Sequence, residues 1–275
     1  MNNTNYILNS SHYDISTKSF KYRLPISQKF ENKKVALTYC SIYKQFFNIS
    51  SEYGNNKFKF TWVDGTEYNI TIKDGNYTIS QINEYLHYIF FTNKLYVVDT
   101  ANNNSLFFCS IIINPTEYGS QMLFFTVPNS TEATSLGYTK PSGATWNFPA
   151  EAVTASLEFG DAFGELIGFT GSSYGNTSEN IVYDNDKTPQ IAKVNALQIH
   201  CNLINNEYTK PNDVLSSMSL SGEFGDLLVF NSGYPLYSKI SVRNYEYLEI
   251  YFSDQNGYKL TIRDTEVLIM LSVVE

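Results

Sequence analysis

Short runs of alternating apolar and polar residues recur along most of this chain, and no other feature limits its fold as strongly. About a dozen such runs occur at spacings of about 8 to 12 residues, which is typical of a β-sandwich or barrel with Greek-key crossings. The 22 Tyr and 19 Phe residues fill many of the apolar positions, and aromatic side chains favour half-buried strands. We therefore expect an all-β protein.

Two local patterns are specific enough to place individual elements. Asp64-Gly65 separates two alternating runs, and both residues tolerate positive φ, so a hairpin is predicted there. Beyond it the apolar period changes, because Ile82, Leu86 and neighbouring apolar residues recur at three and four positions. Thr78 and Gln81 form a capping box at the start of this stretch. We predict one short helix over residues 78–91.

The amino-acid composition of the chain changes at Pro128. From there to Pro189 the sequence is rich in Pro, Gly, Ser, Thr and Asn, which is typical of a long loop region. The predicted division is an N-terminal arm at residues 1–19, one β domain made of residues 20–127 and 189–275, and a loop-rich insertion at residues 128–188.

The C-terminal run differs from the other predicted strands. Ile269 and Leu271 would lie on one face of the strand, while Leu268 and Met270 would lie on the other. A strand that is apolar on both faces is buried on both. We expect its second face to be covered either inside the sandwich or by a neighbouring subunit. The segments 247–254 and 258–264 are also predicted strands, with Leu260 and Ile262 directed inward.

Composition excludes several functional classes. The formal net charge is -8 and no basic cluster occurs, so direct nucleic-acid binding is not expected. The N-terminus has no signal-like pattern and no apolar run is long enough to span a bilayer, so we expect synthesis in the cytoplasm and no membrane span. Cys40, Cys109 and Cys201 lie in apolar runs without zinc-site spacing. We predict three buried thiols.

Candidate catalytic patterns are few. With only three histidines, His12, His87 and His200, a metal cluster is not expected. Residues 171–175 fit the GxSxG pattern around Ser173, and Asp184 or Asp186 and then His200 follow in the order used by α/β-hydrolases. The strand-to-helix setting of such a nucleophile is missing, so no activity at Ser173 is expected.

The remaining candidates have simpler explanations. Asp161 and Glu165 could form an acid pair, but a solvated polar edge is the favoured interpretation. His200 is predicted to be a surface or interface residue on the same strand face as Gln198. Trp62 and Trp146 could form an aromatic platform for a sugar, and a core or subunit-interface position is favoured. We expect no catalytic residue, no cofactor and no metal site.

Several segments resemble one known family. They are SIYKQFFNIS (residues 41–50), FKFTW (58–62), IKDGNYTISQINEYL (72–86), QIHCNLINNEY (198–208) and the C-terminal run from residue 247. In this order they resemble the penton, or minor capsid protein, of virophages and Polinton-like viruses. The similarity spans residues 20–127 and 189–274, and residues 130–188 match least.

This resemblance implies a single jelly-roll β-sandwich with a structural role in the virion capsid and no enzymatic activity. Its implied partners are further copies of the chain, in a homopentamer at the five-fold vertices, and the double-jelly-roll major capsid protein. Two alternatives stay open: another virion jelly-roll protein, such as a spike or minor shell protein, and a carbohydrate-binding β-sandwich or hydrolase. A jelly-roll fold alone does not decide between them.

Overall fold

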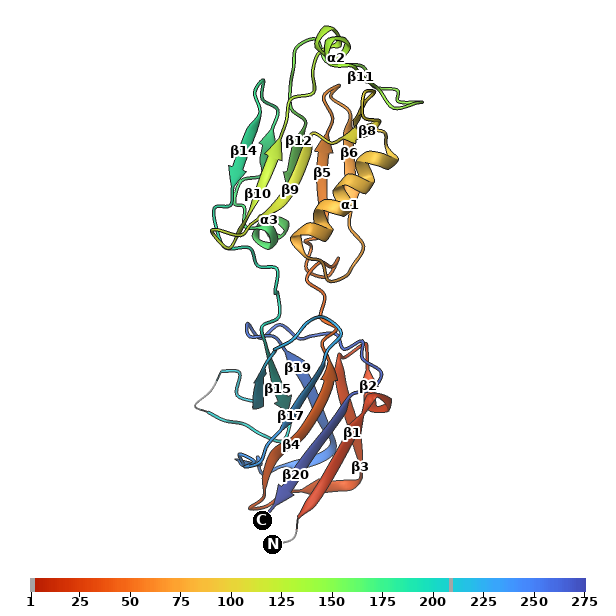
Figure 1. Cartoon of the computed structure of the whole chain (residues 1–275). Helices are drawn as coiled ribbons and strands as arrows, with labels where there is room; N and C mark the ends of the chain where they lie inside the picture. Colours follow the sequence, from red (N-terminus) through yellow and green to blue (C-terminus); the bar gives the residue numbers. More distant parts are fainter. Residues whose placement is uncertain (1–2, 208–209) are drawn as a thin grey trace. The chain divides into compact units, whose positions relative to one another are not determined.

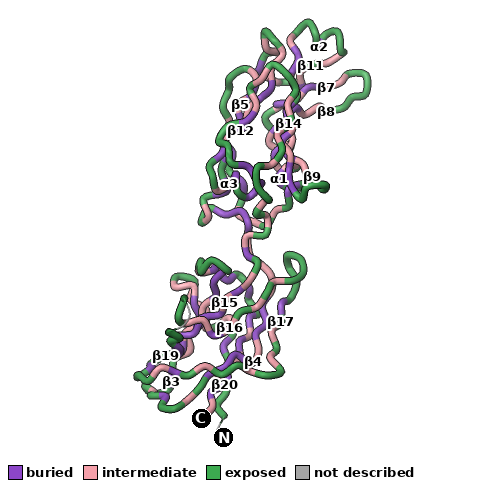
Figure 2. Tube along the Cα trace, turned by 90° about the vertical axis from the view of Figure 1, so that its left-hand side faces the viewer, coloured by how far each residue is buried: buried purple, intermediate pink, exposed green. Residues whose placement is uncertain are grey.

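The computed structural model describes residues 3–207 and 210–275. The first two residues of the predicted arm, and Tyr208 at the end of the segment 198–208, lie outside this part. The chain forms two compact units, residues 1–46 with 194–275, and residues 47–193. Each unit has its own hydrophobic core, and Figure 2 shows the buried stretches inside each of them.

The first unit is a sandwich of two antiparallel sheets. The order of strands in the first sheet is β1-β20-β4-β17, with β18 also paired to β4, and in the second sheet it is β16-β15-β19-β3-β2. The strands are β1 (Thr4–Asn9), β2 (Tyr13–Asp14), β3 (Ser19–Lys29), β4 (Lys34–Tyr43), β15 (Ala196–Cys201), β16 (Val214–Ser219), β17 (Leu227–Asn231), β18 (Ser238–Lys239), β19 (Asn244–Ser253) and β20 (Leu268–Val274). A short 3-10 helix, Ser10–His12, follows β1.

The pairing of the longer strands is that of a jelly roll. In chain order the first strand pairs with the last, β1 with β20, and the second with the seventh, β3 with β19. The third pairs with the sixth, β4 with β17, and the fourth with the fifth, β15 with β16. A long hairpin that is rolled up on itself gives these pairs. Figure 1 shows the result, with the red and blue ends of the chain side by side in β1, β20 and β4.

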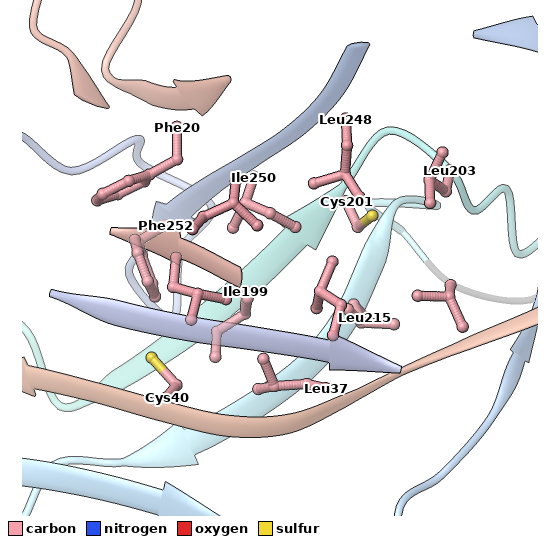
Figure 3. Packing of buried hydrophobic residues seen from close by; sticks show 14 of the residues in the cluster. Phe20, Leu37, Cys40, Ile199, Cys201, Leu203, Leu215, Leu248, Ile250 and Phe252 are labelled. Carbon is pink, nitrogen blue, oxygen red and sulfur yellow. The ribbon is translucent and has the colours of Figure 1, made fainter. Parts of the chain in front are cut away.

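Strand alternation creates the core between the two sheets. On β19, Leu248, Ile250 and Phe252 point inward and are buried, as the sequence pattern predicts. Ile269 and Leu271 on β20 meet them from the opposite sheet. Figure 3 shows this packing, in which side chains of β3, β4, β15, β16 and β19 interdigitate.

The second unit is also mainly β and lies in the connection between β4 and β15. It has three sheets, β13-β12-β5-β6, β14-β10-β9 and β11-β7-β8, around a core rich in aromatic residues. Its strands are β5 (Lys57–Thr61), β6 (Glu67–Thr71), β7 (Val97–Asp99), β8 (Asn104–Leu106), β9 (Cys109–Asn114), β10 (Gly119–Phe124), β11 (Tyr138–Thr139), β12 (Ser156–Phe159), β13 (Ser173–Gly175) and β14 (Ile181–Asp184).

Both local predictions are confirmed. β5 and β6 pair as a hairpin whose turn contains Gly65 at φ 81°. Helix α1 (Ile79–Thr92) begins after Thr78, whose side chain accepts a hydrogen bond from the backbone N–H of Gln81, while the Gln81 side chain caps in return. The all-β class is confirmed as well. Two further short helices, α2 (Ser130–Leu136) and α3 (Asp161–Ile167), lie in the predicted loop region.

The division of the chain differs from the one predicted from sequence. The predicted arm contains β1, which forms an edge of the roll. Residues 47–127 belong to the second unit, and residues 128–188 complete that unit instead of forming a loop insertion. The physical reason is core burial: Leu157 and Phe163 of the Gly- and Ser-rich stretch are buried in the aromatic core.

One predicted strand is absent from the described residues. Residues 258–264 form only a single bridge, between Ser253 and Lys259. Leu260 and Ile262 are nevertheless buried in the core of the roll. The apolar alternation of this segment therefore indicates burial in the core and not a strand paired by a ladder of hydrogen bonds.

Candidate functional site

The residues of the GxSxG pattern are not brought together as an active site. Ser173 lies on β13 in the second unit, while His200 lies on β15 in the first. Asp184 accepts a hydrogen bond from the Gln121 side chain at 2.7 Å. Asp186 accepts from the backbone N–H and the hydroxyl of Thr170. Asp184 therefore links β14 to β10, and Asp186 holds the backbone at Thr170.

The other sequence candidates have structural roles. Asp161 and Glu165 are exposed positions of α3, as the solvated-edge interpretation predicts. Trp62 and Trp146 are buried and pack edge to face with ring centroids 5.2 Å apart. The Trp146 indole N–H donates to the carbonyl of Lys94 at 2.6 Å. The two Trp side chains are core residues, so the idea that they form a sugar platform is wrong.

Sequence reasoning missed a Ser–His–Asp cluster on the second sheet of the roll. His200 is 1% exposed, so its interpretation as a surface histidine is wrong. Its Nδ1 lies 2.8 Å from Oδ1 of Asp213, and its Nε2 lies 2.8 Å from Oγ of Ser253. Tyr251 stacks on the imidazole at 4.2 Å between centroids and donates its hydroxyl to Oδ2 of Asp213 at 2.8 Å.

The electrostatics of this cluster favour an ionised carboxylate beside neutral Tyr251. Burial alone would raise the pKa of Asp213, but hydrogen bonds from His200 and Tyr251 outweigh it and lower that pKa below its usual range. Burial, and then the Asp213 carboxylate, raise the pKa of Tyr251. The ammonium of Lys259 lies 4.3 Å from the centre of the Tyr251 ring, on its face.

The cluster has triad geometry but lacks an accessible nucleophile. Ser253 is 0% exposed, and its hydroxyl donates to the backbone carbonyl of Asp254 at 3.1 Å. A substrate carbonyl therefore cannot reach Oγ in this structure. The arrangement therefore acts as a polar clamp between β15, β19 and the start of β16. A sequence signal did exist, because alternation places Gln198 and His200 on one face, but Asp213 comes from a loop that no pattern links to it.

The described residues also offer no cluster of three or more His, Cys, Asp or Glu side chains that could hold a metal ion. Cys40, Cys109 and Cys201 are free and buried, as predicted. Burial raises the pKa of Cys40 and of Cys201 to about 12, so neither thiol is a nucleophile near neutral pH. In the ranges 3–207 and 210–275, no helix has the length and apolar character to cross a membrane.

The outer face of the first sheet is almost uncharged. Residues that are paired across neighbouring strands form rows on this face. One row contains Ile7, Met270 and Tyr39, and another contains Leu268, Ser41 and Val229. Leu227, Val229 and Ile7 are exposed apolar residues on this face. Within the described strands of this sheet the charged residues are Lys34 and Lys239, which are paired in register at its margin. Such a contiguous apolar surface is typical of an interaction face.

The outer face of the second sheet is polar and charged instead. Lys21 on β3 is in register with Glu249 on β19, and Arg23 is in register with Tyr247. The His200 cluster lies on the same face. This surface resembles the solvated side of an antiparallel sheet.

A groove lies at the β1 edge of the roll. It measures about 540 Å³ and is lined mainly by Tyr6 and Ile7 of β1 and by Tyr22, Leu24 and Ile26 of β3. Tyr6 and Tyr22 pack edge to face within it, at 5.9 Å between centroids. The Tyr6 hydroxyl donates to the Gln28 side chain across the groove at 3.3 Å.

Comparison with known proteins gives similarities to solved structures. No family model and no curated protein matches the sequence. A crystal structure of the mavirus penton protein aligns with 99% of this chain and 97% of its own, at 10% identity and a TM-score of 0.44. The structure of the Sputnik virophage by cryo-EM aligns with 99% of this chain and 97% of its own, at 13% identity and a TM-score of 0.39.

Proposed function

We propose that this chain is a structural virion protein, the penton subunit at the five-fold vertices of an icosahedral capsid, and that it has no catalytic role. The observation that supports the proposal is a jelly roll with one almost uncharged outer face. In addition, segments 41–50, 58–62 and 72–86 of the same chain resemble virophage pentons. Large exposed apolar surfaces mark contact with other proteins. The net charge of -8 argues against direct contact with a nucleic-acid genome.

In the proposed particle the chain forms a homopentamer and contacts the double-jelly-roll major capsid protein around each vertex. A closed ring of identical subunits needs two different, complementary patches on every copy. A single self-complementary patch would give a dimer instead. The roll has such different edges, β1 at one side of the first sheet and β17 with β18 at the other.

The test is the mass of the purified chain as a function of concentration. Mass photometry and sedimentation velocity should reveal a species with five times the mass of one chain. Co-assembly with a double-jelly-roll major capsid protein should place this chain at the vertices of the particles. A stable dimer or trimer, together with particles that contain no five-fold cluster of this chain, would refute the proposal.

A further inference from the structure

The loop between β17 and β18 holds the most exposed apolar residues of the described roll. Tyr234 is 93% exposed and Leu236 is 85% exposed. Tyr237, the next residue, anchors the loop, because its hydroxyl lies 3.3 Å from Oγ of Ser272 on β20. Leu227 and Val229 extend this apolar ridge along β17. Exposing such side chains in a monomer loses the free energy that their burial would give.

The opposite edge of the same sheet carries a matching hollow. Ile26, 76% exposed, and Ile7 flank the groove between β1 and β3, and Tyr22 and Leu24 line it. The groove volume of about 540 Å³ is enough for two large side chains. One edge of the roll therefore has an apolar ridge and the other an apolar groove.

The part of the ridge with Tyr234 and Leu236 lies at the level of the groove, while Leu227 and Val229 lie further along the sheet, in register with Tyr43 and Ser41. One row of paired residues runs from Thr4 through Val273 and Val35 to Ser238. Thr4 lines the groove, and Ser238 directly follows the ridge loop. A ring without displacement along its axis requires complementary patches at equal height, and this row provides them when the strands of the roll run along that axis.

Charge complementarity supports the same pairing of edges. Toward the other end of the sheet, the β17 edge carries two exposed acidic residues, Glu223 and Asp226, beside Lys44, whose ammonium donates to the carbonyl of Gly222 at 2.7 Å. On the β1 and β3 side, Arg23 is exposed, while Lys21, two residues before it, lies 4.0 Å from the carboxylate of Asp14. If the edges of two copies meet head to tail, the acidic pair approaches Arg23. Opposite potentials at the two edges favour this register over the reverse.

We infer that Tyr234 and Leu236 of one copy dock into the groove between β1 and β3 of the next copy, and that Leu227 and Val229 extend this contact along the edge. The inference rests on the proposed function and names the surfaces that close its ring. The two edges are different patches, so the contact is heterologous and propagates around the ring.

The test uses exposed positions of the full-length chain, so that folding of the monomer is preserved. Leu236→Asp on the ridge and Ile26→Asp in the groove should each weaken self-association about tenfold or more in sedimentation velocity. Tyr118→Asp is the matched control, because Tyr118 is an exposed aromatic residue of the second unit. It should leave the association unchanged.

A charge exchange tests the register directly. Arg23→Glu and Glu223→Arg should each weaken the association, and the double variant should recover it at least in part. If the wild type forms a five-fold species and Leu236→Asp and Ile26→Asp form it equally well, the inferred contact is wrong while the proposed function stands. If the wild type forms no five-fold species alone or in particles, the proposed function itself fails.

Discussion

The two outer faces of the jelly roll are built from the same kind of strand and differ in almost every chemical respect. The face of the first sheet has rows such as Ile7, Met270 and Tyr39, with charge only at its margin. The face of the second sheet pairs Lys21 with Glu249 and carries the His200 cluster. One face is suited to contact with another protein surface, and the other to solvent.

The difference between the two faces shows that buried polar groups occur in this fold where they have hydrogen-bond partners. On the second sheet, His200 is buried and both of its ring nitrogens have partners, Asp213 and Ser253. A buried polar group with partners stabilises a single arrangement, while one without partners destabilises the fold. The first sheet avoids the problem by placing apolar or small polar residues on both sides of β20.

The largest expected loss of stability separates the inner and outer faces of a single strand, β20. Ile269→Asp places a carboxylate in the core and should lower the free energy of unfolding by more than about 4 kcal/mol. Leu268→Asp, on the outer face, should lower it by less than about 2 kcal/mol. Urea unfolding of the two variants measures the contrast. Equal losses would mean that both faces of β20 are buried within one subunit.

The second prediction concerns the clamp of the second sheet. His200→Ala leaves Asp213 and Ser253 without their shared partner, and we expect a loss of about 2 to 4 kcal/mol in the free energy of unfolding. His200→Gln keeps polar atoms in the same place and should lose less. If chemical denaturation gives the same midpoint for His200→Ala and the wild type, the cluster has no role in stability.

The pH dependence of stability should follow the same cluster. The pKa of Asp213 is lowered on folding, so its contribution is present above the unfolded pKa of about 3.9 and is lost as pH falls through the folded value. The pKa of Tyr251 is raised, so its contribution is present below about 10 and is lost as pH rises.

Thermal unfolding across pH tests both limbs. Asp213→Asn should flatten the acid limb, and Tyr251→Phe should flatten the alkaline limb. Glu246→Gln serves as a control, because Glu246 is exposed on β19. If the melting temperature of both cluster variants depends on pH as it does in the wild type, the cluster does not cause the pH dependence of stability.

The smallest effect is expected at the serines. Ser173 has no adjacent histidine base among its described contacts, and Ser253 has one but is buried. A fluorophosphonate probe should label neither residue at a rate above background, and Ser173→Ala should change stability by less than about 0.5 kcal/mol. Labelling that disappears in Ser173→Ala or in Ser253→Ala would revive an enzymatic function.

Strand periodicity and local turn chemistry account for what could be predicted from the sequence. Alternation at Leu248, Ile250 and Phe252 fixes their inward direction, and Asp64-Gly65 fixes a hairpin, because both are properties of neighbouring residues. The inner face of β20 followed in the same way from Ile269 and Leu271. These predictions needed no knowledge of distant contacts.

Long-range pairing explains the rest. Nothing within residues 1–19 indicates that β1 pairs with β20, since its partner lies at the other end of the chain. The boundary at residues 46 and 47 is likewise hidden, because strands continue on both sides of it. The His200 cluster joins β15 and β19 to a loop residue, Asp213, and only the folded arrangement brings these three together.

The most direct test of the central claim is an icosahedral reconstruction of particles assembled from this chain and its major capsid protein. We expect a ring of five jelly rolls at each vertex, with the ridge at Leu236 and the groove at Ile26 covered by neighbouring copies. On the second sheet, Glu249 of β19 and Gln198 of β15 should remain outside the contacts within the ring. Vertices that lack this chain, or a ring closed through Glu249 and Gln198, would contradict this prediction.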